Sequence, residues 1–215
     1  MAGTFNEAIS ASESDFDRFV APIMPWMLNG NITSVESDGS AVSRILEMRC
    51  GIDYLLECNG LVYGVARRIQ RLSQGDSPWN TFTVRHERDS GSCTELEKRG
   101  RSILQGSICP MITYQAYVSS DGKLLSMAVA FTKDIIEHCL FNDVTSKHTG
   151  DNQIGQASFI AVKWQDMANH GYTLRTYSRN RGLIQHFDHG HRFDLYSLND
   201  DGMPQYDLQC PTPGF

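Results

Sequence analysis

The chain has 215 residues, of which 40% are hydrophobic and 20% charged, and its formal net charge at pH 7 is −6. This composition is typical of a globular protein with its own hydrophobic core, and it excludes a low-complexity chain. The negative net charge excludes a protein whose whole surface binds a polyanion, although it leaves room for a local basic patch. The longest apolar runs are too short to span a bilayer, so we expect no membrane partner.

The cysteines and the N-terminal residues bear on the cellular compartment. No two cysteines stand in CxxC spacing, so a structural zinc site built from them is not expected. The first seven residues have neither the basic start nor the apolar stretch of a secretory signal. We therefore predict a cytoplasmic protein with reduced, partly buried thiols. The six cysteines are Cys50, Cys58, Cys93, Cys109, Cys139 and Cys210.

The N-terminal part of the chain predicts an extension followed by a helix. Residues 1–39 form this extension, which ends in a loop rich in Gly, Asn and Ser. A helix is predicted over 40–49, because Val42 and Ile45 recur at helical spacing. Gly51 follows as a suitable C-terminal stop, since glycine readily adopts the left-handed conformation that ends many helices.

A β-hairpin is predicted directly after this helix. Asn59-Gly60 is the strongest short signal for a two-residue turn between antiparallel strands. The strands on either side are expected over 52–57 and 61–71. A two-residue turn at this point pairs Cys58 with Leu61, which fixes the register of the whole hairpin.

The rest of the chain alternates between strands and helices. Thr94 with Glu97 forms a capping-box pattern at the start of one of the helices. We predict further strands over 81–88, 111–118, 124–132, 159–164 and 172–178, and helices over 94–104, 134–141 and 165–170.

This order of elements predicts an α/β (α+β) fold, with a mixed, mostly antiparallel sheet flanked by helices. We divide the chain into an N-terminal extension over 1–39, a core over 40–180 and an irregular C-terminal tail over 181–215.

The hairpin register brings chemically useful side chains to one face of the sheet. Counting back from the turn, Asp53 falls opposite Ala66, and Arg68 is then a diagonal neighbour of Asp53 within ~8 Å. Gln70 follows on the same face, because side chains alternate along a strand. An acid, a guanidinium and an amide are therefore expected on one patch.

In this sequence a predicted helix precedes the strand that bears Asp53, and the partner strand carries a cation, Arg68, two residues beyond the position that faces Asp53. This arrangement resembles the PD-(D/E)XK nuclease core. The resemblance covers about residues 40–72, with weaker support to about 118. It implies a restriction-endonuclease-like core that cleaves DNA phosphodiesters with Mg²⁺ or Mn²⁺. In that scheme Asp53 holds the metal, helped by Glu47 from the helix and by Gln70. Arg68 takes the place of the family's lysine and stabilises the charged transition state.

This sequence departs from the family pattern at two positions. Ala66 stands where the family has a metal-binding glutamate, and an arginine is a poorer proton carrier than the usual lysine. The missing oxygen ligand could come from Gln70, or from Glu47, Glu57 or Glu87. A catalytically inactive module that binds nucleic acid or a protein therefore stays open, as does a plain Asp–Arg ion pair in a domain of other purpose. The tract also resembles proteins of mobile genetic elements, and a defence-related factor is a related alternative.

Basic and histidine-rich segments complete the candidate residues. If the chain binds nucleic acid, DNA is the favoured partner, and a homodimer is left open. Three histidines, His186, His189 and His191, have spacing compatible with a transition-metal site or with incidental metal affinity in a loop. The cations expected to follow the nucleic-acid backbone are Arg67, Arg71, Arg85, Lys98 and Arg99.

Overall fold

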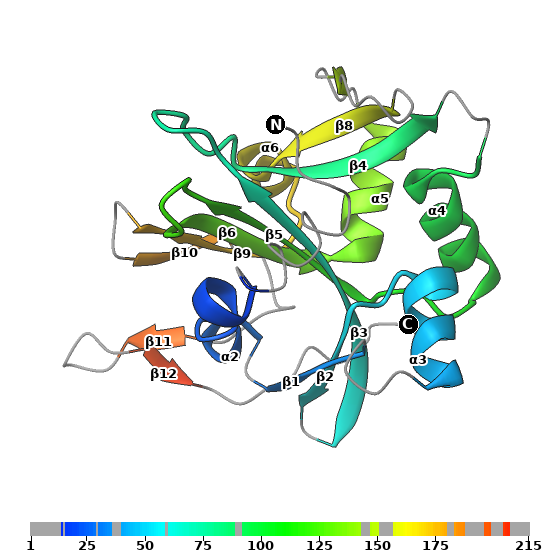
Figure 1. Cartoon of the computed structure of the whole chain (residues 1–215), viewed down its shortest axis with the longest axis horizontal. Helices are drawn as coiled ribbons and strands as arrows, with labels where there is room; N and C mark the ends of the chain where they lie inside the picture. The colour runs from blue at the N-terminus through cyan, green and yellow to red at the C-terminus, as the bar shows by residue number, and fades with distance from the viewer. Residues whose placement is uncertain are drawn as a thin grey trace.

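The computed structural model contains a large seven-stranded and a smaller three-stranded β-sheet with helices packed against them, and a two-stranded sheet formed by the last described strands (Figure 1). It describes residues 14, 16–28, 30–35, 40–58, 60–88, 92–142, 147–150, 157–179, 183–187, 196–198 and 204–206. The helical elements are η1 (Phe16–Val20), α2 (Met24–Leu28), α3 (Ala41–Ile45), η3 (Leu46–Cys50), α4 (Glu95–Gln105), α5 (Thr132–Phe141) and α6 (Trp164–Asn169), where η marks a π-helical turn. The strands are β1 (Asn31–Ser34), β2 (Tyr54–Cys58), β3 (Leu61–Arg71), β4 (Thr81–Arg88), β5 (Ile112–Val118), β6 (Leu124–Phe131), β7 (Lys147–Gly150), β8 (Ala157–Lys163), β9 (Leu174–Ser178), β10 (Leu183–Phe187), β11 (Tyr196–Leu198) and β12 (Pro204–Tyr206).

The large sheet has the strand order β1-β2-β3-β5-β6-β9-β10. Its neighbouring strands are antiparallel except β3 and β5, which run parallel with Val65 opposite Ile112. Parallel neighbours need a long crossover, and here β4 and α4 provide it. The predicted class, a mixed and mostly antiparallel sheet flanked by helices, is confirmed at this level.

The predicted hairpin is also confirmed. Cys58 pairs with Leu61, and the register continues to Tyr54 opposite Val65. Gly60 has φ +75°, which a glycine tolerates at little cost. The helix before the hairpin begins at the Ser40 N-cap, whose hydroxyl accepts from the Ser43 N–H at 3.1 Å. It continues through η3 and stops at Gly51.

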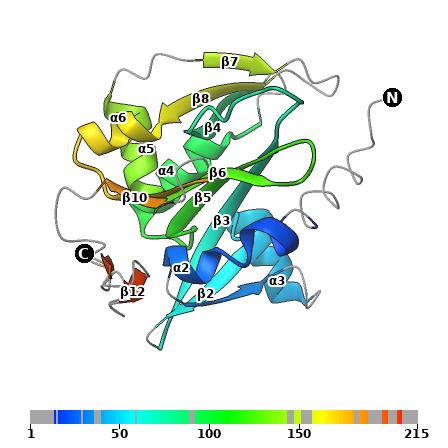
Figure 2. The same ribbon diagram turned by 90° about the vertical axis from the view of Figure 1, so that its left-hand side faces the viewer.

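Hydrophobic side chains fill both faces of the large sheet. On one face, η1 and α2 pack over residues such as Tyr54, Val65 and Tyr114. On the other, α5, α6 and the smaller sheet, ordered β4-β8-β7, cover residues such as Tyr117 and Ala128. Figure 2 shows the smaller sheet above the large one and α2 below it. The large sheet is therefore the middle layer of the molecule.

The structure corrects three of the predicted elements. The loop expected before residue 40 contains β1, which pairs with β2, and the tail expected to be irregular contains β10, which pairs with β9. Sheet hydrogen bonding holds both strands, although their sequences lack a clear alternating pattern. The third predicted strand exists as β4 but belongs to the smaller sheet. The strands β1 and β10 lie outside the predicted 40–180 core but belong to the same large sheet.

Two further findings concern the membrane and the thiols. No helix in the described part of the chain is long and apolar enough to span a bilayer. Cys50, Cys93, Cys109 and Cys139 are free thiols. Cys58, however, is disulfide-bonded, so the expectation of reduced thiols is wrong at that position.

Candidate functional site

Asp53 lies at the junction between the helix and the hairpin, where backbone hydrogen bonds hold it on both sides. Gly51, with φ +69°, turns the chain out of η3. The Asp53 N–H donates to the Val65 carbonyl at 2.9 Å, and its own carbonyl accepts from the Val35 N–H at 3.0 Å. Its carboxylate accepts from the Arg67 N–H at 2.7 Å. This side chain therefore extends the β2–β3 pairing by one bond.

Arg68 has a different partner from the one that the hairpin register suggests. Its guanidinium forms an ion pair with Glu95 on α4, and Glu95 also binds Arg99 at 2.9 Å, one helical turn further on. The backbone N–H of Arg85 donates to the same carboxylate at 3.3 Å. The cations that act on Asp53 are Arg67 and Arg99. The expected Asp53–Arg68 pair is thus replaced by two linked clusters that share Arg99.

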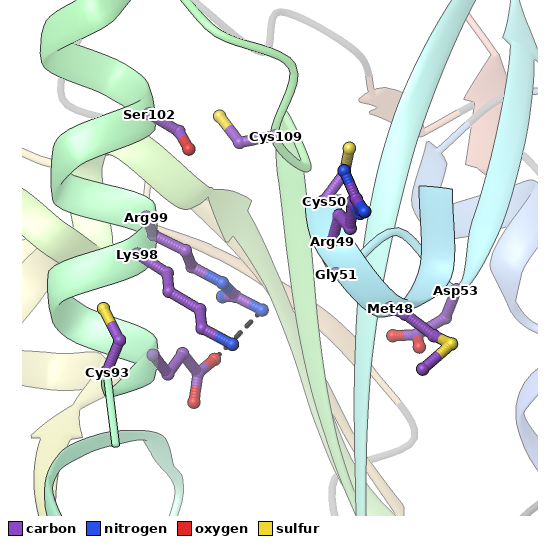
Figure 3. Close-up of a pocket in the computed structure, with 11 residues that line it drawn as sticks. Met48, Arg49, Cys50, Gly51, Asp53, Cys93, Lys98, Arg99, Ser102 and Cys109 are labelled. Atoms are coloured by element: carbon purple, nitrogen blue, oxygen red, sulfur yellow. Dashed lines mark ion pairs between the residues drawn. The ribbon is translucent and has the colours of Figure 1, made fainter. Parts of the chain in front are cut away.

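A pocket of about 230 Å³ opens between η3 and α4. Figure 3 shows Lys98 and Arg99 extending into it from α4, while the Asp53 carboxylate faces it from the opposite wall. Side chains nearest the sheet are the most enclosed: that of Arg99 is 13% exposed and that of Glu95 16%. Lys98 and Arg49 are exposed and stand at the mouth. The lining residues are Met48, Arg49, Cys50, Gly51, Asp53, Cys93, Glu95, Lys98, Arg99, Ser102 and Cys109.

The electrostatics of the two carboxylates differ. Burial raises the pKa of Asp53, and the Arg67 N–H together with the charges of Arg67 and Arg99 opposes this rise without cancelling it. Burial also acts to raise the pKa of Glu95, but Arg68, Arg99 and the Arg85 N–H outweigh it, so that pKa is lowered. Glu95 is therefore a firmly ionised centre of the ion-pair network, whereas Asp53 is protonated more easily than an exposed aspartate.

The pocket and its ion pairs contain more positive than negative charge. Four cations and two carboxylates meet here: Arg49, Arg68, Lys98 and Arg99, with Asp53 and Glu95. Glu47 and Arg67 also interact electrostatically with Asp53. Their charges are opposite, so including both leaves the net charge around the pocket unchanged. The excess is two positive charges in a chain whose net charge is −6. Such a concentration favours an anionic ligand.

The donor set does not fit the magnesium site that the resemblance implies. Asp53 and Glu47 are close enough for their charges to interact, but Ala66, which is fully buried, offers no oxygen ligand. Gln70 lies four residues beyond Ala66 on the same strand, or ~13 Å away, too far to share an ion with Asp53. Within the described ranges, no group of three or more His, Cys, Asp or Glu side chains could hold a metal. We therefore assign no metal-dependent step.

The other predicted cations are divided between the two faces of the sheet. Arg67 points away from the pocket, where its guanidinium binds the Tyr54 hydroxyl and lies 5.4 Å from the centre of that ring. Arg85 and Arg68 both lie over the ring of Phe159, at 5.3 and 5.8 Å from its centre. Arg71 is exposed at the end of β3. Only Lys98 and Arg99 of the predicted cations line the pocket.

The remaining acidic and histidine candidates lie away from this pocket or outside the described residues. Glu57 is exposed on β2, and Glu87 is exposed on β4. His186 belongs to β10, while His189 and His191 lie outside the described residues. The three-histidine site therefore stays a prediction.

The sequence analysis did not single out Glu95, Arg49 or Ser102 as site residues. One signal for Glu95 was present: it stands four residues before Arg99 on a helix with a capping-box start, a spacing typical of an ion pair. The position of Arg49 beside α4 depends on how α3 and η3 pack, which no local pattern encodes.

Comparisons with models of protein families, with curated proteins and with solved structures find no match. The function is therefore inferred from the geometry and the charge of the pocket.

Proposed function

We propose that this protein is a non-catalytic module that binds nucleic acid by holding phosphate in the pocket between η3 and α4. The observation that carries the proposal is the excess of positive charge around that pocket. Phosphate is the anion that a guanidinium fork and an ammonium group recognise best, through charge-assisted hydrogen bonds. A nucleic acid presents such groups in series.

Exposed cations on α4 and on α3, the helix that continues into η3, favour a polymer over a small free anion. Arg44 on α3 and Arg101 on α4 are exposed, in addition to Arg49 and Lys98 at the mouth. These side chains extend the positive region beyond the pocket itself. A backbone that leaves the pocket would meet them next, whereas a small anion would leave them without a role.

The donor set favours binding over metal-dependent cleavage. Ala66 supplies no ligand, and Arg68, at the position of the family's catalytic lysine, is already paired with Glu95. A pocket in which cations outnumber carboxylates, and in which Ala66 supplies no ligand, would hold a phosphate without activating water. Cleavage of DNA with Mg²⁺ or Mn²⁺ is therefore the outcome that would argue for the nuclease alternative.

The test measures binding of single-stranded and duplex DNA by fluorescence anisotropy across a salt series. For a single strand, each phosphate neutralised contributes a slope of about −0.7 in log K against log salt. We expect Lys98→Ala to weaken binding and to make the slope shallower by about that amount. Lys133→Ala is the matched control, because Lys133 is an exposed helical lysine on α5, away from the pocket.

Two results would overturn the proposal. One is an absence of salt-dependent affinity for either DNA. The other is cutting of plasmid DNA with Mg²⁺ or Mn²⁺ that Asp53→Asn abolishes. The binding proposal makes the opposite prediction for this variant: removing a negative charge from the pocket wall should tighten phosphate binding.

A further inference from the structure

We infer that the pocket takes the terminal phosphate of a nucleic-acid strand, a phosphomonoester, in preference to an internal phosphodiester. This inference rests on the function proposed above and specifies its ligand. The charge that the pocket can neutralise and the positions of its cations both favour such a ligand.

The excess positive charge of the pocket matches the negative charge of a phosphomonoester. A terminal phosphate carries about −1.5 to −2 at neutral pH, whereas an internal diester carries a single negative charge. Glu95 is shared between Arg68 and Arg99, so one carboxylate compensates two guanidinium groups. Lys98 and Arg49 add two further positive charges at the mouth, and Asp53 on the opposite wall removes one. The surplus of two charges is thus larger than one diester needs and close to what one monoester supplies.

The Cys109 thiol does not reduce this surplus. Cys50, Cys93 and Cys109 line it as free thiols. Burial raises the pKa of the Cys109 thiol above its ordinary value of 9, so this group stays neutral at physiological pH. Cys109 therefore contributes weakly polar surface near Arg99 and no competing charge.

The depth of the pocket also favours a chain end. Arg99 lies at the enclosed end, where its Nη1 donates to the Thr113 hydroxyl on the sheet at 3.1 Å. Lys98 and Arg49 stand at the mouth. A phosphate within a duplex is held on both sides by its neighbours, so it can reach the mouth but not Arg99. A terminal phosphate on a single strand has one free side and can enter.

The size of the pocket also limits which ligand can enter it. Its volume of about 230 Å³ lies just below the ~300 Å³ at which sites for drug-sized ligands begin. It can therefore accept a phosphate and part of the attached nucleotide. Ser102, one turn beyond Lys98 and Arg99 on the same helix wall, supplies a hydroxyl donor in addition to the two cations (Figure 3).

The decisive experiment compares DNAs that differ only in their ends. One single-stranded sequence is prepared with a 5′-phosphate, with a 3′-phosphate, with hydroxyl groups at both ends, and as a closed circle. We expect a phosphorylated end to bind at least about tenfold more tightly than the hydroxyl-ended strand or the circle, as one added charge-assisted contact gives. Lys98→Gln should abolish this preference, and Lys133→Gln should retain it.

A competition arm separates a strand end from a free nucleotide. Inorganic phosphate and a nucleoside monophosphate are added to the complex with the phosphorylated strand. If the strand end is the ligand, either competitor should displace it only at concentrations far above that of the strand.

Each of the other possible results would overturn a specific claim. Equal binding of the circle and the phosphorylated strand would overturn the end preference but leave nucleic-acid binding intact. A preference that survives Lys98→Gln would show that the end binds elsewhere, and would also overturn the inference. Failure of all four DNAs to bind would overturn the proposed function itself.

Discussion

At the scale of single residues, Asp53 combines a structural and an electrostatic role. Its carboxylate binds the Arg67 N–H at 2.7 Å while it faces the pocket from the wall opposite Lys98 and Arg99. An asparagine at this position retains an oxygen that can accept the same hydrogen bond, but it loses the charge. An alanine loses both. These two substitutions therefore separate the structural role from the electrostatic one.

We expect Asp53→Ala to lower the free energy of unfolding by about 1–2 kcal/mol, because the Arg67 N–H loses its acceptor in a partly buried place. Asp53→Asn should remain close to the wild type. Urea denaturation followed by circular dichroism measures both. If the two variants lose the same stability, the hydrogen bond has no stabilising role and the charge alone matters.

The raised pKa of Asp53 gives a second signature of its burial. A carboxyl whose pKa is raised on folding stabilises the protein fully below its unfolded value of 3.8, and this contribution disappears as the pH rises through the folded pKa. Asp53→Asn should remove that part of the pH dependence. Unfolding free energies of the two proteins, measured at several pH values upward from 3.8, should therefore differ in slope.

Glu95 gives the opposite pH dependence, because Arg68 and Arg99 lower its pKa. Its stabilising contribution is present above the ordinary value of 4.5 and decreases as the pH falls through the lowered pKa. We expect Glu95→Gln to cost about 2–3 kcal/mol near neutral pH, since two guanidinium groups then lose their charged partner. The difference from the wild type should shrink as the pH falls below 4.5. A difference that does not depend on pH would contradict this assignment.

At the scale of elements, the helix formed by α3 and η3 shows that hydrophobic spacing can predict a helix correctly without showing which side of the helix is buried. Val42 and Ile45 have the helical spacing that predicted the helix, and Met48 continues the series. In the structure these three residues, the exposed apolar stripe, are 65%, 51% and 74% exposed. Ser43, on the opposite side, is buried, and Cys50 lines the pocket, which Met48 also borders despite its exposure.

Exposure of the stripe predicts that it adds little to the stability of the monomer. Replacing Val42 and Ile45 together by threonine should change the free energy of unfolding by less than about 1 kcal/mol, as is usual for surface positions. Chemical denaturation checks this, with Val65→Ala as a buried control that should cost about 2 kcal/mol or more. A large loss from the exposed pair would mean that the stripe is covered in solution.

At the scale of the whole molecule, hydrogen bonds join the two sheets across the second core. The Tyr117 hydroxyl of β5 binds Thr81 of β4 three times: it lies 2.8 Å from the Thr81 hydroxyl, donates to the Thr81 carbonyl at 3.0 Å and accepts from the Thr81 N–H at 3.3 Å. Gln115 accepts from Thr83 in the same way, next along both strands. These bonds fix how the smaller sheet sits over the large one.

We therefore expect Tyr117→Phe to destabilise the fold by about 1–2 kcal/mol, because buried polar groups of Thr81 lose their partner while the ring and its packing remain. Thermal unfolding measures the loss. Hydrogen exchange should show that protection falls at β4 before it falls at β3. Unchanged protection at β4 would mean that side-chain packing alone holds the sheets together.

The difference between local and long-range interactions explains which parts of the fold were predictable from the sequence. The turn at Asn59-Gly60, the stop at Gly51 and the cap at Thr94 are local, because each depends on the conformational preferences of a few neighbouring residues. β1 and β10 were missed, since their own residues carry little signal and pairing with β2 and β9 holds them in the sheet. The candidate site follows the same division. The sequence predicted the hairpin register beside which Asp53 lies, one residue before β2. It could not show that Arg68 would turn to a helix residue 27 positions further along the chain.

The sequence by itself determined the hairpin, its register and the face on which Asp53 lies, because backbone sterics and the two-residue period of a strand leave little choice. Tertiary structure decided which charges meet. Only the crossover that makes β3 and β5 parallel neighbours brings α4 opposite η3 at the same pocket, and with it Glu95, Lys98 and Arg99. Coulomb interactions depend on distance in space and not on separation along the chain, so the charge of the pocket could be read only from the folded protein.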